Sequence, residues 1–135
     1  MLSVALAHDL QRAGLRWDEP EPGDRFVVNL PEMLTEPFVL SDVVADMHDV
    51  GGSRVIGFNG TVEWALDSVR LEDTLWLPRE DQLRQRVDPW LRRLERDDGC
   101  YRVVLDIGGE PVEVEGATAE EAYAHALLRL LEPGA

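Results

Sequence analysis

Lysine is absent from this sequence, and cysteine and long apolar runs are scarce. All 13 basic residues are arginine, and Cys100 is the single cysteine, so no disulfide can form within the chain. No apolar run approaches the ~18 residues that a membrane-spanning helix requires. The start, Met1-Leu2-Ser3-Val4, lacks the basic residues and apolar core of a signal peptide. We therefore expect a cytoplasmic protein that does not enter a membrane.

Acidic residues dominate the charge: 27 carboxylates against 13 arginines give a net charge of −14. Arginine without lysine indicates the codon usage of a GC-rich bacterial genome. A surface this negative repels phosphate backbones, so we expect no direct contact with nucleic acid. Two interpretations stay open. The charge either keeps the protein in solution, or it imitates DNA and occupies a nucleic-acid-binding partner, in which case reversing Glu113 and Glu115 would abolish binding.

Length and pattern predict a single α+β domain over residues 1–135, in which antiparallel β-hairpins form a sheet with helices packed against it. Apolar residues at helical spacing predict a helix over 2–13. A second helix is predicted from Pro78, with a buried stripe of Leu83, Val87, Leu91 and Leu94 and an interruption at Asp88-Pro89.

The final third of the chain gives the clearest pattern. Alternating apolar residues in 101–107 and 110–116 flank Gly108-Gly109, which is typical of a two-residue hairpin loop. Thr118 and Glu121 then form a capping box at the start of the last helix. The sequence thus predicts a ββα unit at about 100–132. Another hairpin is predicted between 38 and 58, with its turn at Gly51-Gly52.

The stretch "GFNGTVEWALD" (57–67) concentrates a turn, an indole and two carboxylates. Asn59-Gly60 is a turn pair, and a short helix is predicted after it, with Trp64 and Val69 on its apolar side. Local density of polar and aromatic groups favours a binding surface. The candidate binding residues are Asn59, Gly60, Glu63, Trp64 and Asp67.

An enzymatic alternative uses four of the chain's polar residues. Asp46 and His48 alternate along a predicted strand, and imidazole with carboxylates can hold a divalent ion. Glu63 and Asp67 lie four apart on a predicted helix, where paired carboxylates can divide acid and base roles. Neither HExxH nor a phosphate-binding glycine loop occurs. We expect no catalytic residue, no cofactor and no metal, and we name Asp46 and His48 as the candidates if a metal does bind.

At "GFNGTVEWALDSV" and "LWLPREDQLRQ" the chain resembles a family of short, uncharacterised bacterial proteins that sometimes carry the label "pilus assembly". This resemblance covers most of residues 10–132. The label belongs to a family of large nucleotide-binding ATPases; the present chain has no P-loop and is far too short to be one. The closing stretch "YRVVLDIGGEPVEVEGATAEEAYAHALLRLL" resembles small ββα modules encoded by phages and prophages. Neither resemblance implies catalytic residues.

These observations predict a non-catalytic module for macromolecular interaction or assembly, related to a prophage or a pilus. A protein partner is expected, whose identity the sequence leaves open, as it does homo-oligomerisation. The alternatives are a small hydrolase or metal-dependent enzyme that uses Asp46, His48, Glu63 and Asp67, and an acidic DNA mimic.

Overall fold

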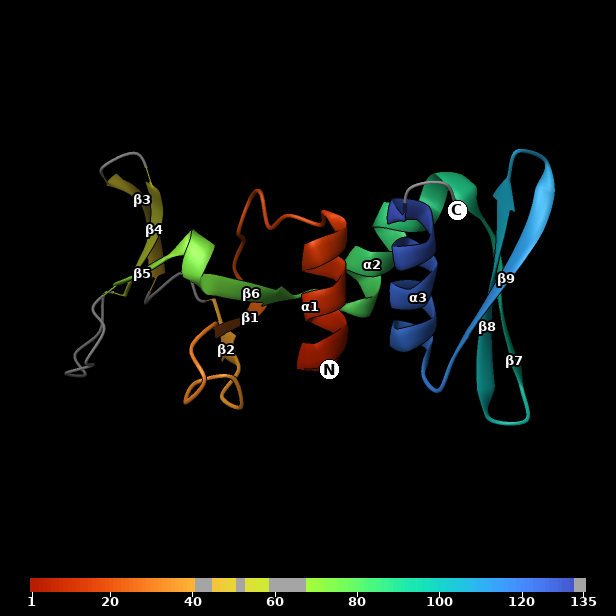
Figure 1. Ribbon diagram of the computed structural model, residues 1–135, viewed down its shortest axis with the longest axis horizontal. Helices are drawn as coiled ribbons and strands as arrows, with labels where there is room; N and C mark the ends of the chain where they lie inside the picture. The colour runs from red at the N-terminus through yellow and green to blue at the C-terminus, as the bar shows by residue number, and fades with distance from the viewer. Residues whose placement is uncertain (41–44, 51–52, 59–67, 133–135) are drawn as a thin grey trace. The chain divides into compact units, whose positions relative to one another are not determined.

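The computed structural model describes residues 1–40, 45–50, 53–58 and 68–132, and it describes side chains only outside 41–70 (Figure 1). Within these ranges the chain forms three α-helices and nine strands, which pair into three antiparallel sheets of three strands each. The predicted α+β class is therefore confirmed. Two compact units are present, one formed by Met1–Leu15 and Pro78–Ala135 and the other by Arg16–Leu77. The single domain over 1–135 stays a prediction.

Helix α1 (Val4–Ala13) ends where the predicted helix over 2–13 ends, but it begins two residues later. The Oγ atom of Ser3 accepts a hydrogen bond from the N–H of Leu6 at 3.2 Å, which caps the first turn. At the other end Gly14 takes a left-handed φ of 116°, and the N–H of Leu15 donates to the carbonyl of Leu10 at 3.0 Å. This is a Schellman cap, so the helix ends where the glycine predicts.

The sequence predicts Pro78 as the first residue of the second helix. Helix α2 (Glu80–Val87) begins two residues later. Arg79 is its N-cap residue, and its backbone N–H donates to Oε1 of Gln82 at 2.9 Å. Leu83 and Val87 are fully buried, as predicted. A short 3-10 turn, η2 (Asp88–Trp90), follows, because Pro89 has no N–H with which to continue the α-helical bonds.

The prediction that helix continues beyond Trp90 is wrong. Residues Leu91–Asp97 form strand β7, which pairs antiparallel with β8 (Cys100–Ile107). A bulge at Arg92 places Leu91 opposite Leu105 and Leu94 opposite Val103, so two leucines three apart share one face of a strand. The spacing that indicated a helix therefore arises from the bulge, and Leu94 is 38% exposed instead of buried.

The ββα unit forms as predicted. Strand β9 (Glu110–Gly116) pairs with β8 across Gly108-Gly109, and α3 (Ala119–Leu131) packs on one face of the sheet β7-β8-β9 (Figure 1). The Oγ1 atom of Thr118 accepts from the N–H of Glu121 at 3.1 Å, and the Glu121 carboxylate accepts from the N–H of Ala117 at 2.8 Å. In the usual capping box this carboxylate accepts from the N–H of the N-cap residue, whereas here it accepts from the residue before it.

In the unit Arg16–Leu77, strands β1 (Arg25–Val28), β2 (Phe38–Val39) and β6 (Thr74–Leu77) form one sheet. Its buried cluster comprises Trp17, Phe26, Val28 and Leu40. The Nε1–H of Trp17 donates to the buried carboxylate of Asp24 at 2.9 Å, which fixes the preceding loop to this core.

The second sheet of this unit contains β3 (Ala45–Val50), β4 (Ser53–Phe58) and β5 (Ser68–Arg70), and η1 (Leu71–Asp73) leads from it into β6. Antiparallel pairing of β3 with β4 confirms the predicted hairpin. Its first strand is shorter than predicted, because residues 38–39 form β2 and pair with β1 instead. Val69 lies in β5 opposite Ile56, so its assignment to the predicted helix is wrong. Pairing with β4 supplies the backbone bonds that a strand needs and that local pattern does not reveal.

Candidate functional site

The five candidate binding residues, Asn59, Gly60, Glu63, Trp64 and Asp67, all lie outside the described residues. Asp46 and His48 lie two positions apart in β3, opposite Gly57 and Val55, but their side chains are not among those described. The predictions at these seven positions therefore stay predictions. The sheet β7-β8-β9, whose side chains are described, carries a charged cluster.

The two faces of this sheet differ in chemistry because side chains alternate along each strand. Val103 and Leu105 of β8 are fully buried on the face that α3 covers, and their partners in β9 are Val114 and Val112. The opposite face carries the alternating residues, with Arg102 at its centre. Register places Glu95 on one side of Arg102 and Glu115 on the other, in a row across all three strands.

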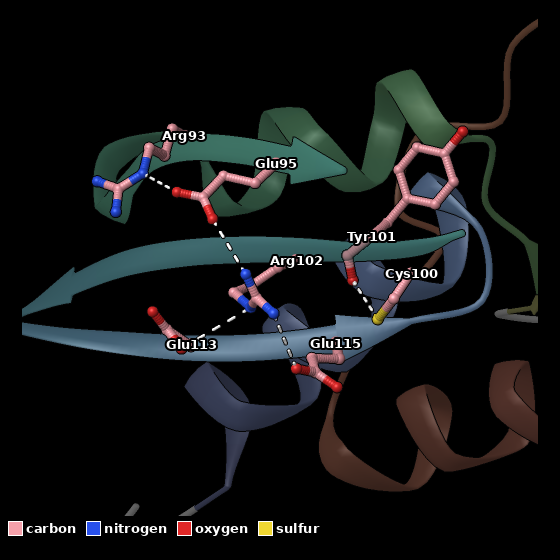
Figure 2. A network of polar contacts seen from close by, with 7 residues as sticks. All are labelled: Arg93, Glu95, Cys100, Tyr101, Arg102, Glu113 and Glu115. Carbon is pink, nitrogen blue, oxygen red and sulfur yellow. Dashed lines mark hydrogen bonds and ion pairs between the residues drawn. The ribbon is translucent and has the colours of Figure 1, made fainter. Parts of the chain in front are cut away.

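Arg102 contacts three carboxylates on this charged face (Figure 2). Its Nη1 atom donates to Glu95 Oε2 at 3.2 Å, its Nη2 atom to Glu115 Oε1 at 3.4 Å, and its Nε atom lies 3.8 Å from Glu113 Oε2. Glu95 also accepts from Nε of Arg93. The Arg102 side chain is 24% exposed and those of Glu113 and Glu115 are 60% exposed, so the cation lies deeper than the two acids of β9.

These contacts shift the protonation equilibria of the charged face. Hydrogen bonds from Arg93 and from Arg102 hold the pKa of Glu95 below its ordinary value of 4.5. Hydrogen bonds to Glu95 and Glu115 raise the pKa of Arg102. Glu95 and Arg102 are therefore each held in the charged form by their neighbours, and neither is poised to exchange a proton near neutral pH. Among the described side chains, the chemistry of this face is that of a structural ion-pair network that fixes strand register.

Sequence reasoning missed Arg102, although the signals were present. A two-residue loop at Gly108-Gly109 dictates that Arg102 lies opposite Glu115. Asp98-Gly99 is likewise a hairpin dipeptide, and both residues have positive φ, 50° and 76°. Reading 91–96 as helix hid this second hairpin, and with it the place of Glu95.

The remaining feature is the outer edge of the sheet at β7, which we call the β7 edge and define as Trp90 with Leu91–Asp97. Trp90 is 40% exposed and Leu94 is 38% exposed. Leu94 lies on the same face of the sheet as α3, but α3 packs over the neighbouring strands β8 and β9. The arginines beside them are engaged within the chain: Arg92 with Asp106 at 3.1 Å, and Arg96 over the ring of Tyr101 at 5.6 Å.

Within the described ranges, no three His, Cys, Asp or Glu residues gather in a way that could hold a metal ion. No helix in that part of the chain is long and apolar enough to cross a membrane. No protein-family model, no curated protein and no solved structure matches this chain. The resemblances noted from sequence therefore stay predictions, and the case for function depends on the physical chemistry of the sheet.

Proposed function

We propose that this chain is a non-catalytic interaction module that binds another macromolecule through the β7 edge. The observation that supports it is the joint exposure of Trp90 and Leu94 on one short segment at the border of a sheet. Tryptophan is among the residues most enriched at the positions that dominate binding energy. Burial of an apolar neighbour such as Leu94 against a partner is also favourable. A cytoplasmic location belongs to the same proposal.

The strand itself adds a second means of recognition. Among the described residues, β7 pairs only with β8, so its other side presents backbone N–H and C=O groups. An extended segment of a partner can add to such an edge, with main-chain hydrogen bonds for affinity and side-chain contacts for specificity. Five of the seven residues of β7 are exposed, which leaves this edge accessible within its own unit.

The proposal is tested by capture from the native host with four forms of the full chain. We expect wild-type protein to retain a partner that Leu94→Arg loses, because a charge replaces the apolar contact. Val39→Arg is the matched control, since Val39 is also apolar, exposed at 58%, and located on the edge strand β2 of the other unit. Trp64→Ala tests the surface predicted from sequence. Retention of every partner by Leu94→Arg contradicts a role for the β7 edge.

The two alternatives respond to different measurements. Under the enzymatic alternative, titration with divalent metal shifts the melting temperature, and Asp46→Asn with His48→Ala abolishes that shift. Under the DNA-mimic alternative, capture is salt-sensitive and depends on Glu113 and Glu115. Because both glutamates surround Arg102, their reversal also disturbs the sheet, so each variant requires a melting curve beside the binding measurement.

A further inference from the structure

The two edges of the sheet β7-β8-β9 differ in how they would meet a second copy of the chain. Every charge on β9 is negative, from Glu110, Glu113 and Glu115, and Pro111 removes a backbone donor. No register of β9 against itself can therefore pair opposite charges, which is how natural proteins protect an edge strand. The β7 edge has no proline within its strand, and it carries charges of both signs around an apolar residue.

From this contrast we infer that the partner of the β7 edge is a second copy of this chain, added antiparallel about a two-fold axis at Leu94. This inference rests on the proposed function and names the partner of the same surface. In the register centred on Leu94, Arg93 of each copy lies opposite Glu95 of the other, and the two Leu94 side chains meet on the axis. An isologous contact of this kind closes as a dimer.

Neighbouring registers are worse, because side chains opposite each other in a sheet share a face and like charges there are destabilising. Centring on Arg93 or on Glu95 brings identical charges together at the axis. Centring on Arg96 opposes two arginines and also places Glu95 against Asp97. The register centred on Leu94 does place Arg92 opposite Arg96, but Arg92 lies in the bulge and is bound to Asp106, while Arg96 lies over Tyr101.

The net charge of −14 opposes association of two copies. Attraction between them must therefore come from opposite charges that lie directly against each other. At physiological ionic strength the Debye length is about 8 Å, which screens distant charges but not directly opposed ones. The four charges of the two Arg93–Glu95 pairs therefore act while most of the overall repulsion is screened. Trp90, which directly precedes the strand in η2, is also exposed.

Sedimentation equilibrium of the full chain at physiological ionic strength tests this inference. We expect a concentration-dependent dimer, weakened on the order of tenfold or more by Leu94→Arg, which places two cations on the axis. Val39→Arg is expected to dimerise as wild type does. Circular dichroism and melting curves check that each variant is folded; Leu94 is exposed in the single chain, so its replacement leaves the core intact.

Exchanging the charges at positions 93 and 95 tests the proposed register directly. In a dimer of Arg93→Glu alone, a glutamate at 93 lies opposite a glutamate at 95 in both pairs. In a dimer of Glu95→Arg alone, both pairs consist of two arginines, so each variant is expected to be monomeric. Mixed in equal amounts, the two variants recover both opposite-charge pairs and are expected to form a heterodimer. Loss of folding cannot produce that recovery, and if Glu95→Arg proves unfolded, Leu94→Arg still decides.

A wild-type chain that stays monomeric at every accessible concentration overturns the inference, as does a dimer that Leu94→Arg leaves unchanged. A monomeric chain that still captures another protein, and loses it in Leu94→Arg, also overturns the second-copy partner but retains the proposed interaction function. A dimer that withstands both Leu94→Arg and the charge changes, in a chain that captures nothing through this edge, contradicts both.

Discussion

At Gly116 the backbone of strand β9 lies directly against the backbone of helix α3. A Cβ atom added there would lie 2.4 Å from the backbone nitrogen of Ala122 and 2.9 Å from its Cα. Both are backbone atoms of a helix, so neither can move without displacing the helix itself. Absence of a side chain at this position allows the strand to end directly beneath α3.

We therefore predict that Gly116→Ala lowers the free energy of unfolding by about 1–3 kcal/mol, the usual cost of inserting atoms into a packed site. Chemical denaturation measures it. The control is Gly108→Asn: Gly108 has a φ of 62°, a Cβ there meets nothing within 4 Å, and asparagine tolerates this conformation. Equal stability of Gly116→Ala and wild type would show that β9 and α3 are further apart than described.

Residue-level signals were most reliable where a residue acts on its own backbone. Ser3, Gly14 and Thr118 begin or end helices through bonds to groups within five positions. The predicted helix end at residue 13 and the predicted capping box at Thr118 are confirmed, whereas the cap at Ser3 was not predicted. Gly116 gave no such signal. Its constraint comes from Ala122, and sequence does not state how closely a helix and a strand approach each other.

At the scale of elements, the charged face of the sheet β7-β8-β9 couples three strands through one guanidinium. Glu95, Arg102 and Glu115 lie in one row, and Arg93 and Glu113 flank the next row around the buried Val104. The stems of long charged side chains in such positions shield apolar surface while the charged ends stay in water. The ion pairs thus lie on the same face as a buried apolar residue, opposite the face on which α3 packs.

This arrangement predicts a pH-dependent stability. The folded-state pKa of Glu95 is lowered below 4.5, so its contribution is complete above that value and is lost as the pH falls through the lowered pKa. The difference in unfolding free energy between wild type and Glu95→Gln should therefore be largest near neutral pH and should decline in acid. Urea denaturation across this range measures the difference.

Removing the cations provides the control for that measurement. In a background of Arg93→Met with Arg102→Met, the carboxylate of Glu95 loses the hydrogen bonds that lower its pKa. The acid-dependent part of the difference should then shrink. A difference that is independent of pH in the wild-type background would contradict the role given to these ion pairs.

Elements were predictable where local pattern and partner strand agree. The hairpin of β8 and β9 and helix α3 follow from alternation, a two-glycine loop and a capping box. Strand β7 was not predictable in this way, because its bulge turned a strand period into the i, i+3 spacing of a helix. Pairing with β8 decided the outcome.

For the whole molecule, the division into two compact units sets the pattern of cooperativity. Phe26 belongs to the buried cluster of Arg16–Leu77, whereas Leu83 is buried in the unit formed by Met1–Leu15 and Pro78–Ala135. Each side chain supports the unit that contains its neighbours. Local opening follows such cooperative units.

We predict that Phe26→Ala, at a cost of about 3–5 kcal/mol, increases amide hydrogen exchange mainly within Arg16–Leu77. Leu83→Ala, at about 2–5 kcal/mol, should do so mainly in the other unit. Mass spectrometry of exchange, peptide by peptide, distinguishes them. Equal loss of protection throughout the chain in both variants would instead support the single domain predicted over 1–135.

The sequence by itself determined the α+β fold class, since periodicity, turn dipeptides and caps are local signals that act through nearby backbone bonds. It also established the excess of negative charge, which requires no coordinates. Tertiary structure alone decided that 91–97 is a strand, that Arg102 joins three carboxylates, and that Trp90 and Leu94 are exposed. These features depend on which distant segments pair, and local pattern does not contain that information.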